Sequence, residues 1–193
     1  YFGRRANGIY IPRYRNLFGD KRDYLRGFGY QGGGGREGYN HEVAEYSIGK
    51  EYKEALTVPG PWTMNIGGFG EILPYHENKV TLDKTKTDKW GLNVLNIDCE
   101  LKENELKMRK DMETDAVEML EAAGVKNVKS RSGNPYPGRG IHEMGTARMG
   151  KDPKTSVLNS FNQVWDAKNV FVTDGSFMVS AACVNPSLTY MAM

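Results

Sequence analysis

Two polar residues near the end of the sequence, His142 and Asn185, stand in settings that suit proton transfer and the binding of partial negative charge. His142 lies in segment 141–150 (IHEMGTARMG), where the small residues that follow it would let a flat ligand approach its ring. An imidazole can act as a general base near neutral pH. A single histidine is more often structural, so this segment alone leaves both roles open.

Asn185 begins segment 185–190 (NPSLTY), which predicts the start of a helix. Asn or Ser can cap a helix, and Pro186 is pre-organised for the first helical position. The free N–H groups of such an end favour partial negative charge. A well-capped helix without any ligand satisfies the same pattern.

Segment 169–176 (NVFVTDGS) predicts a buried strand that runs into Asp174 and Gly175. A turn of this kind can present a carboxylate and backbone N–H groups to a cofactor hydroxyl or phosphate. An ordinary turn after a core strand would have the same composition, so the segment by itself does not decide.

The order and spacing of these segments together resemble the C-terminal signature of the glucose–methanol–choline (GMC) oxidoreductases. Residues 142–150 match the family's His-x-x-Gly-Thr-x-Arg-Met-Gly, and residues 152–159 (DPKTSVLN) match Asp-Pro-x-x-Ser-Val-Leu-Asn. Residues 169–176 match Asn-x-Phe-Val-Thr-Asp-Gly-Ser, and residues 185–189 match Asn-Pro-x-Leu-Thr. A weaker similarity, to the family's Glu-Asn-Arg-Val segment, lies at residues 77–82 (ENKVTL).

The resemblance implies an enzyme that oxidises a CH–OH group by hydride transfer to FAD. His142 stands where the family has the base that takes the hydroxyl proton. Asn185 stands where the family has the partner that holds the same oxygen, so this chain resembles the His/Asn members. An amide cannot compete for the proton but can donate to the developing alkoxide. Glu143 stands where many members have proline.

The resemblance also implies cofactor contacts. Asp174 and Gly175 match positions that contact the ribityl–pyrophosphate region of FAD, and Pro186 and Ser187 match the helix start that faces the pyrimidine edge of the flavin. The family's dinucleotide-binding Gly-x-Gly-x-x-Gly loop lies near its N-terminus, and this chain is expected to have none. We therefore expect an N-terminal FAD-binding domain to be missing, and this chain alone to bind FAD poorly or not at all.

The expected substrate is a sugar or another polyol. Segment 61–71 (PWTMNIGGFGE) faintly resembles the Pro-Trp segment of the pyranose oxidase branch of the family. Asn65 falls where that branch places an amide against a sugar hydroxyl, while Gly67 replaces a histidine. Trp62 and Asn65 are expected to stack on and hydrogen-bond to a sugar, although Trp62 also suits a plain core position.

The elements that must position these residues are predicted to form an α+β fold with an antiparallel sheet. Short apolar or alternating runs predict strands at 44–48, 63–66, 70–73, 79–82, 92–99 and 125–128. The four-glycine run Gly32–Gly35 predicts a flexible loop.

One long helix is predicted over residues 104–123 and is expected to pack on one face of the sheet. Its apolar stripe starts at Leu106 and ends at Ala123, with Asn104 as N-cap and Gly124 as stop. Residues 1–139 are expected to form the substrate-binding region. Residues 140–193 are expected to form a catalytic and FAD-contacting segment whose pieces belong to the missing FAD domain.

The composition excludes several other classes. A net charge of only +2 argues against a nucleic-acid-binding protein. No stretch approaches the roughly 20 apolar residues of a membrane span. Cys99 and Cys183 give neither a metal-ligand spacing nor a disulfide framework, and each is expected to be a small buried residue. The opening at Tyr1 and the unfinished helix at Met193 suggest a piece of a longer protein.

Two other functions are compatible with the residues. One is a non-catalytic carbohydrate-binding module derived from the same family, and the other is a structural interaction domain. Neither needs both His142 and Asn185, so the enzyme is favoured. The residues do not distinguish an oxidase from a dehydrogenase, and they do not identify the electron acceptor. They allow a periplasmic or a cytoplasmic location if the protein is bacterial.

Overall fold

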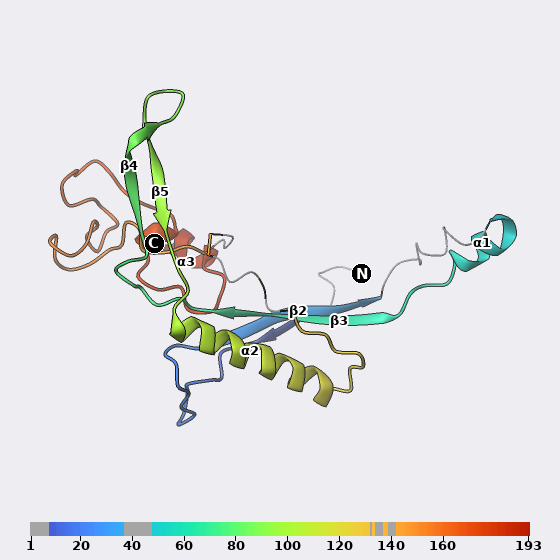
Figure 1. Cartoon of the computed structure of the whole chain (residues 1–193). Helices are drawn as coiled ribbons and strands as arrows, with labels where there is room; N and C mark the ends of the chain where they lie inside the picture. Colours follow the sequence, from blue (N-terminus) through green and yellow to red (C-terminus); the bar gives the residue numbers. More distant parts are fainter. Residues whose placement is uncertain (1–7, 37–47, 132, 134–136, 139–141) are drawn as a thin grey trace.

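The computed structural model describes residues 8–36, 48–131, 133, 137–138 and 142–193. Two antiparallel sheets make up its β structure (Figure 1). The main sheet has the order β1 (Gly8–Ile11), β2 (Phe28–Arg36) and β3 (Trp62–Gly70), with β2 in the centre. A second sheet pairs β4 (Lys79–Thr87) with β5 (Asn93–Asp98).

One long helix and several short ones complete the fold. Helix α2 (Glu103–Ala122) packs on the main sheet, and α1 (Gly49–Ala55) lies at the end of an arm that leads into β3 (Figure 1). The 3-10 helix η2 (Gly175–Phe177) and the helix α3 (Ser187–Ala192) lie in the C-terminal segment 142–193. The fold is therefore α+β, which confirms the predicted class.

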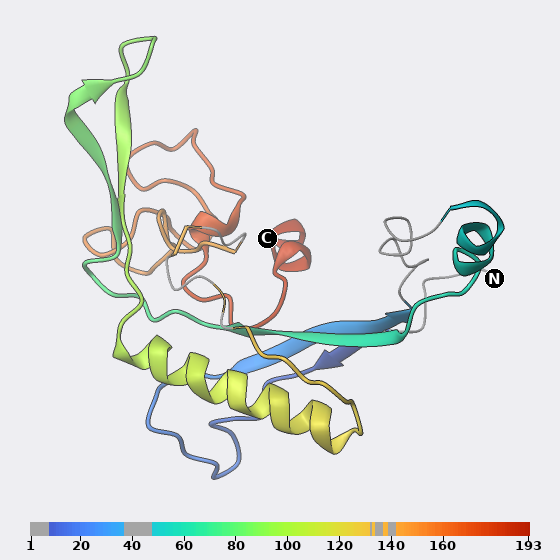
Figure 2. The same ribbon diagram turned by 45° about the vertical axis from the view of Figure 1, so that its right-hand side comes forward.

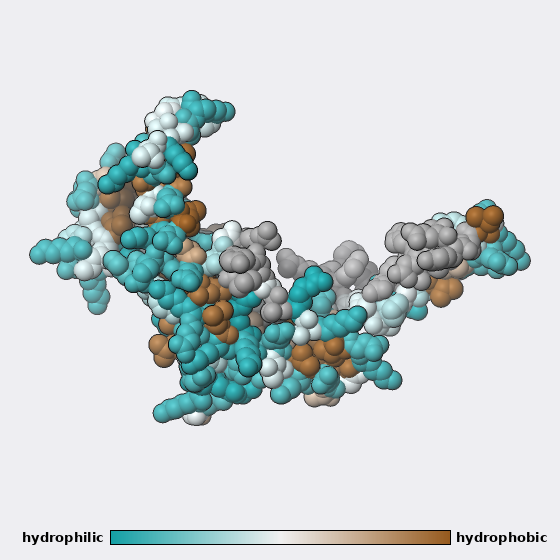
Figure 3. All heavy atoms as spheres, in the orientation of Figure 1, coloured by the Kyte–Doolittle hydropathy of each residue, from teal (hydrophilic) through white to brown (hydrophobic). Residues whose placement is uncertain are grey.

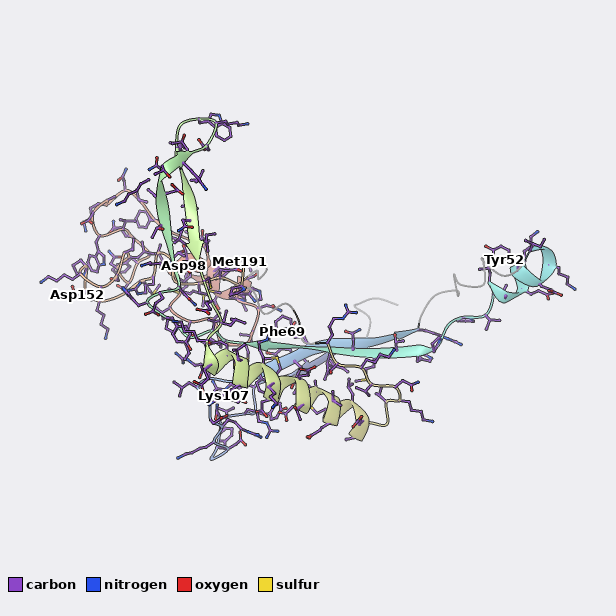
Figure 4. All side chains as sticks on the ribbon, viewed as in Figure 1. Tyr52, Phe69, Asp98, Lys107, Asp152 and Met191 are labelled. Atoms are coloured by element: carbon purple, nitrogen blue, oxygen red, sulfur yellow. The ribbon has the colours of Figure 1, made fainter. Side chains whose placement is uncertain are left out.

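The main sheet has two distinct faces because side chains alternate along each strand. On the face toward α2, which we call the helix face, Phe28 is fully buried and Tyr30 is 1% exposed. They form the core with Tyr24 and Met108. The C-terminal segment lies on the opposite side of the sheet, which we call the open face (Figure 2). Figure 4 labels Phe69 of β3 on this upper side and Lys107 of α2 below the sheet.

Two glycines of β3 let α2 lie close to the helix face. A Cβ added at Gly68 would stand 2.0 Å from Sδ of Met112. A Cβ added at Gly70 would stand 2.8 Å from Cε of Met108. The absence of side chains in the strand therefore makes room for the methionines of the helix.

Helix α2 begins and ends within one residue of the prediction. At its end, Gly124 has φ +83°, and its N–H donates to the Glu121 carbonyl while the Val125 N–H donates to the Leu120 carbonyl. This is the Schellman arrangement that glycine favours.

The predicted start and stripe of α2 need correction. The N-cap is Lys102, whose N–H donates to Glu105, whereas Asn104 accepts from the Leu25 N–H at 2.6 Å. Leu106 is 51% exposed, whereas the buried side of the helix carries the polar Glu105 and Asp115.

A polar cluster joins α2 to the loop between β1 and β2. Asp115 accepts hydrogen bonds from Nε and Nη2 of Arg15 at 2.7 and 2.6 Å, and from the Tyr14 hydroxyl at 2.6 Å. One turn away, Asp111 accepts from the Tyr24 hydroxyl at 2.5 Å. These paired groups anchor the helix to the N-terminal part of the sheet.

The prediction of a loop at Gly32–Gly35 is wrong, because these glycines lie in β2. Gly32 and Gly33 pair with β1 on one side and β3 on the other. Pairing with both neighbouring strands therefore stabilises an extended conformation that glycine alone disfavours. Residues 27–32 (GFGYQG) do have Gly-x-Gly-x-x-Gly spacing, contrary to the expectation that the chain has none. They run into and along a strand rather than joining a strand to a helix, so they do not form a dinucleotide-binding loop.

Other predicted strands had mixed outcomes. The runs 63–66, 79–82 and 92–99 lie in or around β3, β4 and β5, while the run 70–73 only ends β3. Residues 125–128 form no strand, and the left-handed backbone of Asn127, φ 57°, interrupts an extended chain there. Residues 44–47 lie outside the described part of the chain.

The predicted strand in segment 169–176 is also wrong. Phe171 makes a single bridge to Gln163, and no neighbouring strand runs beside it in the part of the chain that the structure describes. Val170 is 43% exposed and Phe171 56%. With only this short pairing on one side, the extended residues form no regular strand.

The β4–β5 hairpin projects from the body of the molecule (Figure 1). Its register pairs Val80 with Ile97 and Leu82 with Leu95, which places all four side chains on one side. All four are exposed, and apolar side chains show at the surface near the base of the hairpin (Figure 3). Among the described residues, no helix is both long enough and apolar enough to cross a membrane.

Candidate functional site

The open face of the main sheet carries few side chains. Register places Gln31 of β2 opposite Gly67 of β3, and Gly33 opposite Asn65. Residues directly opposite share a face, so Gln31 and Asn65 are neighbours across the two strands. The Sγ of Cys183 lies 3.5 Å from where a Cβ on Gly29 would stand, which shows that the C-terminal segment approaches this face.

Asn185 reaches the open face directly. Its Nδ2 donates a hydrogen bond to Oε1 of Gln31 at 3.2 Å. The Asn185 side chain is otherwise exposed, and Gln31 is half-buried. The contact joins two residues far apart in the sequence and sets the amide of Asn185 above the central strand of the sheet.

A second tie holds the same segment to the sheet. The Ser180 hydroxyl donates to Glu71, which directly follows β3, and Arg26 lies 3.8 Å from the same carboxylate. Cys183 is buried, as predicted, whereas Cys99 is exposed, contrary to prediction. No group of three or more metal-ligating side chains occurs among the described residues.

Helix α3 starts directly after Asn185. Pro186 is buried and is the N-cap, and Ser187 is the exposed first helical residue. The first N–H groups of a helix have no intrahelical acceptor. They therefore remain free to meet an electron-rich group at this end of α3.

Asp174 and Gly175 lie in the turn that begins η2. The Oδ1 of Asp174 accepts from the Ser176 N–H at 2.8 Å and from its hydroxyl at 2.5 Å, and these bonds lower the pKa of Asp174. The carboxylate is exposed and ionised, and Oδ2 accepts no hydrogen bond from a described residue. It can thus accept from a hydroxyl of a bound molecule.

Gly175 lies where three motifs meet. A Cβ there would stand 2.6 Å from the Tyr190 hydroxyl of α3 and 3.0 Å from the Glu143 carbonyl. The Tyr190 ring packs edge-on against Phe177 of η2, and its hydroxyl lies 3.5 Å from Sδ of Met144. Only glycine allows the histidine segment and α3 to approach the turn this closely.

The histidine segment is fixed to the same turn through its backbone. The Ala147 N–H donates to the Ser176 carbonyl at 3.0 Å, and the Met149 N–H donates to the Phe177 carbonyl at 2.9 Å. His142 is half-buried and begins this segment. No hydrogen bond joins His142 to Asn185 or to another described residue.

Trp62 and Asn65 are not brought together. They are three residues apart in a regular strand, so their side chains leave opposite faces of the sheet. Asn65 shares the open face with Gln31, while Trp62 is 73% exposed on the other side. Trp62 is therefore not a core residue.

Gln31 was not singled out from the sequence. The available signal was the alternation within residues 29–35 (GYQGGGG). Positions 29, 31, 33 and 35 would share one face of a strand, and all of them are glycine except Gln31. Once these residues are recognised as a strand, a lone polar side chain on a glycine face becomes a candidate for ligand contact.

Comparison with known proteins places these contacts in context. A sequence profile for the C-terminal region of GMC oxidoreductases matches residues 74–193. The chain is 38% identical over 125 residues to 2-methyl-1,2-propanediol dehydrogenase from Mycolicibacterium austroafricanum, covering 65% of this chain and 22% of that protein.

Two other relatives act on different compounds, according to their names. The C-glycoside 3-oxidase of Arthrobacter globiformis is 30% identical over 137 residues, 70% of this chain and 26% of that protein. The gluconate 2-dehydrogenase flavoprotein of Pantoea cypripedii is 26% identical over 145 residues, 72% of this chain and 24% of that protein. The chain thus spans about a quarter of the length of these relatives.

Proposed function

The chain belongs to the GMC oxidoreductase family, and we propose on this premise that it is the C-terminal, substrate-side part of an FAD-dependent enzyme that oxidises a CH–OH group. An FAD-binding domain on the N-terminal side would complete it. Below, the complete flavoprotein means this chain joined to that domain.

The observation that carries the proposal is the position of Asn185. Its amide is held over the open face by Gln31, at the start of a helix whose Tyr190 packs against the turn of Asp174 and the segment of His142. Three motifs of the C-terminal segment therefore lie together, and Asn185 joins them to Gln31, 154 residues earlier in the sequence. A binding module without chemistry would not require this convergence.

In the proposed reaction the substrate loses a proton from oxygen and a hydride from carbon, leaving a carbonyl. His142 takes the hydroxyl proton as general base. Asn185 donates a hydrogen bond from its amide to the same oxygen as negative charge develops there. When bound, FAD supplies the hydride acceptor.

The C-terminal segment offers groups that fit part of a flavin site. The ionised Asp174, with Oδ2 available, suits a cofactor hydroxyl. The free N–H groups after Pro186, beginning with that of Ser187, suit an electron-rich edge of the flavin. A pyrophosphate-binding loop is not formed by the described residues, so we assign that loop to the proposed N-terminal domain.

The open face favours a neutral polyol or sugar as substrate. Its side chains from the three strands are neutral: Tyr10, Gln31, Thr63, Asn65 and Phe69. A neutral face of this kind suits substrate hydroxyls, whereas a sugar acid would call for a cation. Trp62 lies on the other face, so we assign the substrate contact to Asn65 alone.

The proposal is tested by mixing the complete flavoprotein anaerobically with neutral polyols and sugars and, in parallel, with sugar acids. We expect a neutral compound to bleach the oxidised flavin absorbance and to yield one carbonyl per flavin reduced. Retained flavin that no CH–OH compound reduces, together with measurable glycan binding, would instead support the non-catalytic carbohydrate-binding module. Reduction by sugar acids alone would contradict the neutral substrate class.

A further inference from the structure

We propose that Gln31 is a positioning residue for the reaction, which orients the amide of Asn185 toward the substrate oxygen. This inference rests on the proposed function, in which Asn185 stabilises the developing charge. Gln31 itself acts on the substrate only through Asn185.

The location of Gln31 suits this role. It lies in the central strand β2, paired with Tyr10 of β1 on one side and Gly67 of β3 on the other. Its backbone is therefore held from both sides. The other β2 positions on this face, Gly29, Gly33 and Gly35, are all glycine. No other side chain of β2 can reach Asn185 from the open face.

Asn185 needs such a support. Its amide group can rotate about χ2, and this terminal torsion has no narrow preference. Only an amide that turns an N–H toward the substrate can stabilise an alkoxide, since its carbonyl would repel the charge. The bond to Gln31 uses one N–H of Nδ2 and leaves the second for a ligand.

The contact is separate from the core that stabilises the sheet. That core is on the helix face, around Phe28 and Tyr30, and α2 covers it. Loss of the Gln31 carbonyl should therefore change the orientation of Asn185 without unfolding the sheet.

The experiment is a double-mutant cycle on flavin reduction in the complete flavoprotein. The variants are Gln31→Met, which keeps the length of the side chain but removes the amide, Asn185→Ala, and the two combined. Thr114→Val is the control, because it removes a hydroxyl from α2, on the opposite side of the sheet from Asn185. Flavin content and melting temperature are recorded for each variant.

We expect Gln31→Met to slow flavin reduction by roughly threefold to tenfold, the loss of one neutral hydrogen bond. The apparent substrate affinity and the melting temperature should change little. In the Asn185→Ala background, Gln31→Met should have no further effect on the rate, because the amide that Gln31 orients is already absent. Thr114→Val should leave the rate unchanged.

Different failures lead to different conclusions. If Gln31→Met slows the reaction equally with and without Asn185, or leaves it unchanged in both, Gln31 does not act through Asn185, although the proposed function stands. If the wild-type flavin is not reduced by any CH–OH compound, the proposed function itself fails. A fall in rate matched by a fall in flavin content would overturn the positioning role in favour of a structural one.

Discussion

At the scale of single residues, Asp115 anchors α2 to the loop between β1 and β2. Its side chain is 6% exposed and accepts three hydrogen bonds from Arg15 and Tyr14. Burial alone would favour the neutral acid, but these bonds and the Arg15 charge outweigh it and lower the pKa of Asp115. Burial and the bond to Asp115 also raise the pKa of Tyr14 to about 12, so Tyr14 remains a donor at neutral pH.

Asp115→Asn should reduce the free energy of unfolding by about 2–3 kcal/mol at pH 7, because hydrogen bonds to a buried charge are lost. Since folding lowers this pKa, the contribution of Asp115 is present above about pH 4 and is lost as the pH falls through the folded value. Urea unfolding of wild type and variant should therefore converge under acidic conditions.

The control for this prediction is Glu54→Gln, which breaks the exposed ion pair with Lys50. Exposed pairs contribute little, so the free energy of unfolding should not change measurably. A constant gap between wild type and Asp115→Asn from pH 7 to acid would show that Asp115 does not act through its charge.

The residues of the candidate site were predictable only in part. His142, Asn185, Asp174 and Pro186 could be singled out because they stand in ordered motifs that resemble a family signature. Gln31 could not, since its role depends on a strand pairing that brings it beside a residue far along the sequence. The same pairing places Trp62 and Asn65 on opposite faces of the sheet. Their closeness in the sequence had suggested that they act together.

At the scale of secondary structure, β2 shows why the glycine run was misjudged. Glycine weakens isolated strands, and composition alone therefore predicted a loop. In the fold, however, a Cβ on Gly32 would stand 2.0 Å from the Asn65 carbonyl oxygen and 2.8 Å from Cα of Ile66. Close contact between strands requires glycine here, and that requirement becomes visible only when β3 is in place.

Gly32→Ala should destabilise the sheet by about 1–3 kcal/mol, the usual cost of overpacking, because the obstructing atoms are backbone. Gly35→Ala is the matched control in the same strand, since a Cβ there has no heavy atom within 4 Å. It should be neutral or slightly stabilising. Thermal unfolding of both variants checks this, and equal melting temperatures would contradict the register of β2 with β3.

Helix α2 was predictable because its signals are local. The periodic apolar residues and Gly124 define its length without reference to other elements. The strand expected at 169–176 depended instead on neighbours, and the described part of the chain supplies only one bridge, from Phe171 to Gln163. Apolar residues at Val170 and Phe171 remain exposed as a result.

At the scale of the whole molecule, many exposed apolar side chains lie in two places. One group lies on one side of the β4–β5 hairpin and the other along the C-terminal segment, including Leu188 at 76% and Met191 at 78%, while others, such as Phe18 and Ile48, lie elsewhere. Apolar surface of this extent marks contact surfaces. It agrees with the proposal that residues 140–193 belong against an FAD-binding domain, while residues 1–139 supply the substrate wall.

The arm that leads to β3 and the C-terminal helix lie on the same side of the sheet (Figure 2). Tyr52 marks the far end of this arm, and Met191 lies in α3 (Figure 4). The open face of the sheet, where Asn185 meets Gln31, lies between this arm and α3. The architecture therefore gathers the proposed chemistry on one side of the sheet and leaves α2 to stabilise the other.

The most direct test of this account is the rate of flavin reduction in the complete flavoprotein, followed anaerobically by stopped-flow with its CH–OH substrate. Wild type is compared with His142→Ala, with the exposed His76→Ala as control. Loss of a general base should slow flavin reduction by about 10²–10⁴-fold, while flavin content stays the same. His76→Ala should react like wild type. An unchanged rate in His142→Ala would remove this histidine from the chemistry and contradict the proposed mechanism.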